Sequence, residues 1–141
     1  MAMNFKISVF SCGMLLLSNI LACGTSELDF SPEINGCSNW DFNNPDNTYL
    51  QIVRDGNDIL ISRQGVIQEC DAEFTPEYSV DGYKIHVYEN WLLSETPSEC
   101  ETCLAPTIRI NNYDEQELEF WWFEGSDSIP FGVVQTSELE D

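Results

Sequence analysis

The chain has 141 residues, of which 25 are Asp or Glu and only five are Lys or Arg, so its formal net charge is −20. This charge excludes nucleic-acid binders of the usual kind and proteins held to anionic lipid by basic patches, because both need clustered Lys and Arg. Hydrophobic residues make up 43% of the chain and aromatic residues 12%, which is typical of one folded domain and not of a disordered acidic tail.

Residues 1–22 have the composition of a secretory signal peptide. Lys6 is the single charged residue of this segment, and an apolar run from Ile7 to Leu21 follows it. The run is shorter than the roughly 20 residues that a transmembrane helix needs. A leader that is removed is therefore favoured over a membrane-spanning helix.

The leader ends in Ile20-Leu21-Ala22-Cys23-Gly24. This segment resembles the lipobox of bacterial lipoproteins, in which an aliphatic, a variable and a small residue precede a cysteine. The resemblance covers residues 1–24 only. It implies that Cys23 receives a diacylglyceryl group, becomes the first residue of the mature chain and is acylated with a palmitate-type chain. Two or three such chains anchor a protein stably in a membrane. Gly24 stands where the inner-membrane retention signal has Asp, which implies the outer membrane. A plain signal peptide cut near Ala22 is the alternative.

The polar residues 23–36 predict a lipidated N-terminus and a tether, followed by a folded domain over residues 37–136 and an acidic tail over residues 137–141. Asp-Gly pairs at residues 55–56 and 81–82 are typical of hairpin turns. The expected strands are 49–54, 59–63, 66–74, 78–80, 83–89, 107–111, 117–123 and 129–134, with a long loop over 92–106. The pattern predicts an all-β domain, a small antiparallel β-sandwich or barrel.

The third expected strand carries an acidic ladder of Glu69, Asp71 and Glu73 at alternate positions. Carboxylates at this spacing lie about 7 Å apart on one strand face. Their repulsion would be relieved by a cation or by a basic partner. A solvated face that protects a sheet edge from aggregation is the alternative. Cys70 and Phe74 are expected to point inward from the same strand.

Four cysteines are expected in the mature chain besides the lipidated one: Cys37, Cys70, Cys100 and Cys103. An even number in an exported domain predicts two disulfides, and three pairings are open. The Cys100-x-x-Cys103 spacing also fits a redox or a zinc site. Glu99 and Glu101 disfavour a reactive thiolate, however, and a second pair of zinc ligands is missing from the sequence.

Metal and cofactor binding find little other support. The loop acids Asp41, Asp46, Asp55 and Asp58 do not fit the spacing of a calcium-binding loop. We therefore predict neither a metal nor a cofactor.

The expected strand 117–123 presents two different faces. Its even-numbered residues are apolar and predict a core face. The possible binding face consists of the odd-numbered residues Glu117, Glu119, Trp121 and Phe123. Aromatic rings beside carboxylates can stack on a sugar ring and accept hydrogen bonds from its hydroxyls. Burial of Trp121 and Phe123 in the core, at one end of a twisted strand, is the alternative.

Catalysis is not predicted. The chain has one histidine, His86, expected on an outward strand position beside Lys84, and it lacks the common catalytic motifs. Carboxylate pairs suited to glycoside hydrolysis would occur by chance among so many acids.

The predicted function is that of a membrane-anchored envelope lipoprotein whose acidic domain binds a partner. The charge favours a basic protein, since opposite charge steers association. A carbohydrate- or peptidoglycan-binding module is the alternative, as is a structural envelope protein without a ligand. The domain is expected in the periplasm or at the cell surface.

Overall fold

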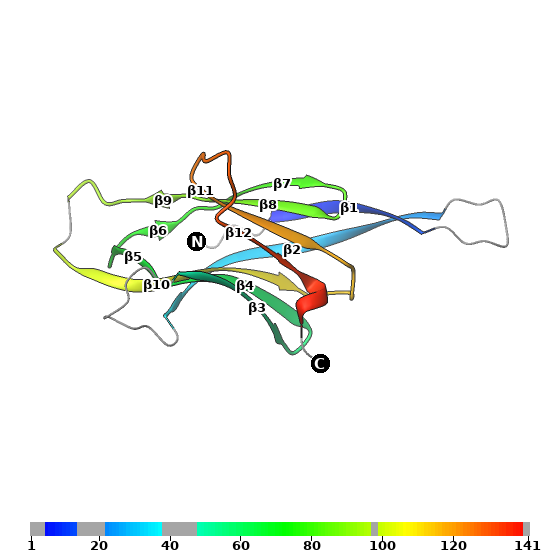
Figure 1. Ribbon diagram of the computed structural model, residues 1–141, viewed down its shortest axis with the longest axis horizontal. Helices are drawn as coiled ribbons and strands as arrows, with labels where there is room; N and C mark the ends of the chain where they lie inside the picture. Colours follow the sequence, from blue (N-terminus) through cyan, green and yellow to red (C-terminus); the bar gives the residue numbers. More distant parts are fainter. Residues whose placement is uncertain (1–4, 14–21, 38–47, 97–98, 140–141) are drawn as a thin grey trace.

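The computed structural model describes residues 5–13, 22–37, 48–96 and 99–139 (Figure 1). These residues form twelve strands and one short 3-10 helix, η1 (Thr136–Glu138). The described segments contain no helix that is long and apolar enough to cross a membrane. Strands stacked in two layers make up most of the molecule, which confirms the predicted all-β fold class.

The larger sheet has the strand order β1-β2-β10-β4-β3, and β5 pairs with β10 beside this path. All of its described pairings are antiparallel. Its strands are β1 (Phe5–Gly13), β2 (Ala22–Gly36), β3 (Tyr49–Asp55), β4 (Asp58–Gln64), β5 (Val66–Glu69) and β10 (Glu101–Asn111).

The smaller sheet has the order β12-β11-β8-β7, and β6 pairs with β9 in a separate two-stranded ribbon. Its central strands β8 and β11 run parallel, so the expectation of a purely antiparallel fold is wrong at this pair. The chain passes through the larger sheet as β10 between them, which permits the parallel pairing. The strands are β6 (Glu73–Phe74), β7 (Glu77–Asp81), β8 (Lys84–Glu89), β9 (Trp91–Leu92), β11 (Glu119–Glu124) and β12 (Gly132–Gln135).

The core lies between the two sheets and is built from alternate residues of the strands. Side chains at every second position point inward because successive residues of a strand face opposite sides. Burying this apolar surface stabilises the fold by roughly 25 cal/mol per Å². Its fully buried members include Phe30, Ile59, Ile61, Ile85, Val87, Ile108, Ile110, Phe120 and Trp122.

Strand β10 changes partners in its middle. Residues 107–110 pair with β4, and residues 101–104 pair with β5. Pro106 stands between the two pairings, opposite the break at Gly65, whose φ is +86°. Proline has no N–H to donate, so it is tolerated where the ladder on that side is interrupted. The expected loop over 92–106 is therefore wrong from Glu101 onward.

The expected tether over residues 23–36 is wrong in its second half. From Asp29 to Gly36 the chain pairs with β10, and Leu28 and Phe30 belong to the core. Residues 22–28 have only β1 as a described strand partner. The domain therefore begins before Cys37, because two apolar residues anchor an otherwise polar segment.

The structure contains two disulfides among its described cysteines, as predicted. They join Cys37 to Cys103 and Cys70 to Cys100. The two cysteines of the Cys-x-x-Cys segment thus have different partners. Each bond closes a long loop, which stabilises the fold by about 4 kcal/mol in the chain-entropy model. Cys70 is exposed, so the expectation that it points inward is wrong.

Candidate functional site

The outer side of the smaller sheet carries four adjacent rings, His86 and Tyr88 on β8 and Trp121 and Phe123 on β11. We call this surface the ring-lined face. The parallel register places Trp121 opposite His86 and Phe123 opposite Tyr88. The alternating inward residues of both strands belong to the core, which directs these four rings away from it.

The four rings contact one another in a continuous row. The His86 ring centroid lies 5.8 Å from that of Trp121 and 5.5 Å from that of Phe123. Tyr88 stacks on Phe123 at 5.1 Å. Phe123 is buried by these neighbours, whereas His86, Tyr88 and Trp121 stay partly exposed. The accessible part of the face is therefore formed by three rings supported by a fourth.

Charged and amide groups close one end of the ring-lined face. Glu119 accepts a hydrogen bond from the indole N–H of Trp121 and another from Gln135 Nε2 at 3.0 Å. Lys84 Nζ lies 3.9 Å from Glu119 Oε1 and 5.1 Å from the centre of the Trp121 ring. These contacts hold the Glu119 carboxylate and the indole in fixed relative positions.

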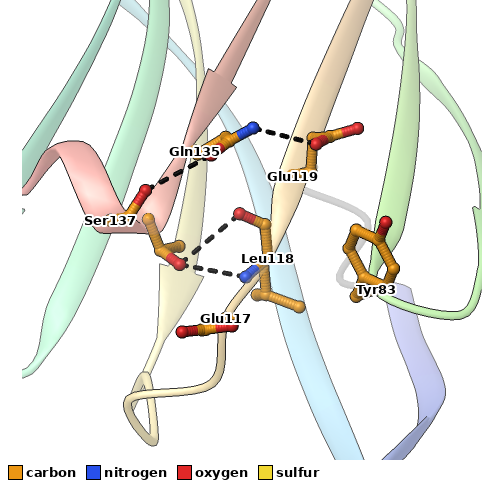
Figure 2. Close-up of a pocket in the computed structure, with 7 residues that line it drawn as sticks. Tyr83, Glu117, Leu118, Glu119, Gln135 and Ser137 are labelled. Atoms are coloured by element: carbon orange, nitrogen blue, oxygen red, sulfur yellow. Dashed lines mark hydrogen bonds between the residues drawn. The ribbon is translucent and has the colours of Figure 1, made fainter.

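A hollow of about 220 Å³ adjoins this end, and we call it the first hollow (Figure 2). Figure 2 shows Gln135 reaching Glu119, with Tyr83 and Ser137 on opposite sides of Leu118. The lining is polar on most sides. It consists of Tyr83, Glu117, Leu118, Glu119, Gln135, Thr136 and Ser137.

A second hollow of about 520 Å³ lies at the other end of the same strands. Tyr88 belongs both to its lining and to the ring-lined face, and Glu77 pairs directly across from Tyr88 on β7. The residues that line the second hollow are Thr75, Glu77, Tyr88, Asn90, Gly125 and Ser126.

Three of the four residues of the predicted binding face lie together on one surface, and two rings of β8 lie beside them. Glu119, Trp121 and Phe123 lie on the outer side of β11, outside the core between the sheets. Glu117 precedes β11 and lines the first hollow. The sequence pattern already placed His86 outward. What it lacked was the parallel register that brings His86 and Tyr88 beside β11.

The predicted acidic ladder does not form. A turn at Cys70-Asp71 separates β5 from β6, so Glu69, Asp71 and Glu73 do not share one strand face. The carboxylates gather differently, because Glu69 lies directly opposite Glu101 in the β5–β10 pairing. We call the region around this pair and the neighbouring carboxylates Asp71, Glu73 and Glu99 the acidic end.

The acidic end lacks internal compensation of its charge. It comprises Glu69, Asp71, Glu73, Glu99 and Glu101, on the two segments joined by the Cys70–Cys100 disulfide. None of the ion pairs within the described ranges involves these five carboxylates. Across the residues that the structure describes, no group of three or more His, Cys, Asp or Glu side chains is arranged to hold a metal ion.

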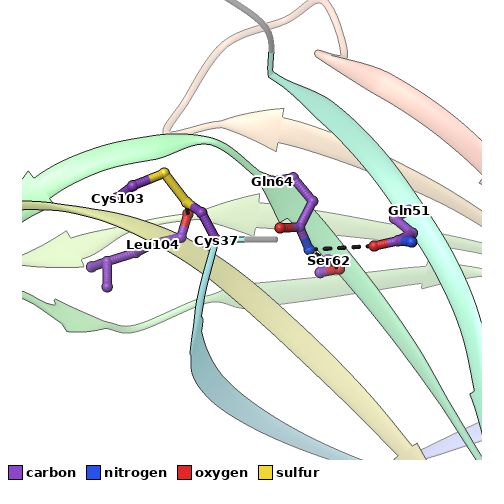
Figure 3. The surroundings of a disulfide bond; sticks show 6 residues. All are labelled: Cys37, Gln51, Ser62, Gln64, Cys103 and Leu104. Atoms are coloured by element: carbon purple, nitrogen blue, oxygen red, sulfur yellow. Dashed lines mark hydrogen bonds between the residues drawn. A yellow bond between two sulfur atoms is a disulfide. The ribbon is translucent and has the colours of Figure 1, made fainter. Parts of the chain in front are cut away.

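The outer side of the larger sheet, by contrast, pairs its polar groups with one another. Beside the Cys37–Cys103 disulfide, Gln64 Nε2 lies 3.1 Å from Ser62 Oγ and 3.4 Å from Gln51 Oε1 (Figure 3). Figure 3 shows these polar side chains next to the disulfide, in a region where Ser62 and Gln64 are buried. In the described part of this surface, these amide and hydroxyl groups are therefore already hydrogen-bonded to one another.

Comparisons of the chain with protein-family models, with curated proteins and with solved structures find no match. Its function is therefore inferred from the residues of the site.

Proposed function

We propose that the chain is an exported lipoprotein, anchored through Cys23 in the outer membrane, with its domain in the periplasm or at the cell surface. The lipobox-like segment before Cys23 and the paired cysteines of the domain support this, since disulfides persist in oxidising compartments. Expression with labelled palmitate tests it. We expect the label in the wild-type protein and none in Cys23→Ser, whereas equal labelling of both would contradict lipidation at Cys23.

The ring-lined face favours carbohydrate binding as the function of the domain, ahead of the basic protein partner that the charge alone favours. The observation that carries this proposal is the row of contacting rings on an outer sheet face, with a hydrogen-bonded carboxylate at its end. Partly exposed apolar surface of this kind marks binding surfaces on small domains. Pyranose rings present apolar C–H faces that pack on aromatic rings, and their hydroxyls donate to carboxylates.

A glycan array probed with the purified full-length protein tests this function. We expect binding to at least one glycan, little affected by salt, and at least about tenfold weaker in Trp121→Ala. Tyr49→Ala is the matched control, since Tyr49 is an exposed ring on the other sheet. Binding that survives Trp121→Ala unchanged would rule out the ring-lined face as its site.

A basic protein bound at the acidic end is the second candidate function. It is supported by the cross-strand pair Glu69 and Glu101, which places like charges opposite each other without a compensating ion pair among the described residues. Capture of a basic envelope protein that is released by salt would support this candidate. Release should also follow from Glu69→Gln with Glu101→Gln, and not from Trp121→Ala. Capture that both variants retain would contradict it.

A further inference from the structure

We infer that the first hollow, the ring-lined face and the second hollow form one elongated site for an oligosaccharide that is uncharged or carries amino groups. This inference rests on the proposed carbohydrate binding and goes beyond it in two respects. It assigns the ligand a length, and it assigns the ends of the ligand a chemistry.

The length follows from the strands that carry the site. Glu119 lines the first hollow, and Tyr88, beside Phe123, lines the second. Because β8 and β11 are parallel neighbours, the rings between these points form two adjacent cross-strand pairs, Trp121 with His86 and Phe123 with Tyr88. From Glu119 to Phe123 the strand rises by about 13 Å, at roughly 3.3 Å per residue. This span from the Glu119 carboxylate across the rings is longer than a single sugar ring, and a hollow extends it at each end.

The chemistry at the ends follows from what lines the hollows. The first hollow carries the carboxylates of Glu117 and Glu119, and the second carries that of Glu77. Within the described chain, none of the residues lining either hollow is basic. Ionised carboxylates only accept hydrogen bonds, so at each end these carboxylates call for donors from the ligand, whereas the hydroxyl and amide groups beside them can donate or accept. Hydroxyl and ammonium groups are donors, whereas carboxylate, phosphate and sulfate groups are not.

Lys84, the basic side chain beside the first hollow, does not alter this preference for a ligand that donates hydrogen bonds. Lys84 lies over the Trp121 ring and 3.9 Å from Glu119, so its charge is already directed toward a carboxylate. On β7, Glu77 and Asp81 add exposed negative charge along the same edge of the sheet. An acidic glycan would meet repulsion at both ends of the site, where the carboxylates of one sign focus the field.

Calorimetric titration of the full-length protein with matched oligosaccharides tests the inference. The probes are a neutral β-1,4-glucose series from monosaccharide to hexasaccharide, the amine-bearing glucosamine hexasaccharide and the acidic galacturonic hexasaccharide. We expect affinity to rise at least about tenfold from the monosaccharide to the hexasaccharide. We also expect the amine-bearing probe to bind at least as tightly as the neutral one, and the acidic probe to bind at least about tenfold more weakly.

Variants at the two ends separate this inference from the underlying function. Glu117→Gln and Asn90→Ala, one in each hollow, should weaken the hexasaccharide several-fold and leave a disaccharide bound at the rings unaffected. Equal affinities for short and long probes, or tight binding of the acidic probe, would overturn the elongated site while carbohydrate binding stands. Failure of every sugar to bind would overturn both.

Discussion

Two arginines, Arg63 and Arg109, each contact more than one carboxylate, in opposite settings. Arg63 lies between the sheets with its side chain 11% exposed, 2.9 Å from Glu89 and 2.5 Å from Glu124. Its guanidinium also packs over a phenylalanine ring at 4.2 Å. Arg109 lies on the outer side of the larger sheet, 24% exposed, and contacts three carboxylates at 2.9–3.1 Å: Glu33, Asp55 and Asp58.

The buried centre, formed by Arg63, Glu89 and Glu124, includes hydrogen bonds as well as ion pairs. The surface centre is formed by Arg109 with Glu33, Asp55 and Asp58. Glu89 accepts hydrogen bonds from the indole N–H groups of Trp91, at 2.9 Å, and Trp122, at 2.7 Å, besides that from Arg63. The ion pairs of Arg109 on the surface replace hydrogen bonds to water by hydrogen bonds to protein groups. Their net contribution to the stability of the fold is therefore small. The comparison shows that arginine–carboxylate pairs differ in how much their loss lowers the free energy of unfolding. The loss is larger at the buried pair, because removing one partner leaves an uncompensated charge there.

The largest effect is expected from Glu89→Ala. It leaves Arg63 and two indole N–H groups without their acceptor in a buried region, and should lower the free energy of unfolding by about 3–5 kcal/mol. Urea-induced unfolding measures the loss. Glu99→Ala, an exposed residue of the acidic end, should stay within about 0.5 kcal/mol of wild type. Similar stabilities for both variants would show that the buried contacts of Glu89 contribute no more to stability than an exposed carboxylate does.

An intermediate effect is expected from Arg63→Lys. The charge remains, but an ammonium group does not reproduce the planar fork that contacts Glu89 and Glu124 together. We expect a loss of about 1–3 kcal/mol in urea-induced unfolding. Glu124→Gln tests the outer contact alone and should cost less than Arg63→Lys, since Glu124 is half exposed. The reverse order would place the main stabilising contact at Glu124.

A smaller effect is expected from Arg109→Ala, in spite of its three carboxylate neighbours. Exposed ion pairs contribute about 1 kcal/mol or less, and salt screens them. The difference in stability between wild type and Arg109→Ala should therefore shrink in molar sodium chloride, whereas the deficit of Arg63→Lys should persist. A salt-independent loss above about 2 kcal/mol would show that the surface centre behaves like the buried one.

The smallest effect concerns pH. The backbone N–H of Asn112, and then Arg109, hold the pKa of Asp58 below its usual value. A lowered pKa in the folded state stabilises the protein above the ordinary carboxyl pKa, and this contribution disappears as the pH falls through the lowered value. Asp58→Asn should therefore be less stable than wild type at neutral pH and nearly equal to it near pH 2. A difference in stability that stays constant across this pH range would show that the lowered pKa of Asp58 does not contribute to folding stability.

Local sequence signals predict local structure well in this chain. The Asp-Gly pairs at residues 55–56 and 81–82 form the expected turns, and both glycines have φ of +62°. Glycine adopts this left-handed conformation without steric cost. The hairpins of β3–β4 and β7–β8 follow from these turns. Alternation also assigns the even-numbered residues of 117–123 to the core correctly.

Long-range pairing accounts for most of what the sequence did not reveal. The disulfide pairing, the partner change of β10 and the parallel register of β8 and β11 depend on residues far apart in the chain. The same holds for the site. Trp121 and Glu119 could be singled out within one strand, whereas His86 and Tyr88 joined them only through the register. The acidic ladder failed because a turn at Cys70-Asp71 interrupts the alternation that defined it.

The pairing of β2 with β10 also affects when the larger sheet can fold. Asp29 and Asn111 are partners although 82 positions separate them in the chain. The central strands of the larger sheet are thus assembled only after most of the chain has been synthesised, and such distant pairings fold in milliseconds to seconds. For a chain proposed to cross a membrane before it folds, this delay is an advantage. Slow pairing of distant strands leaves a newly made chain unfolded for longer, which suits the proposed export.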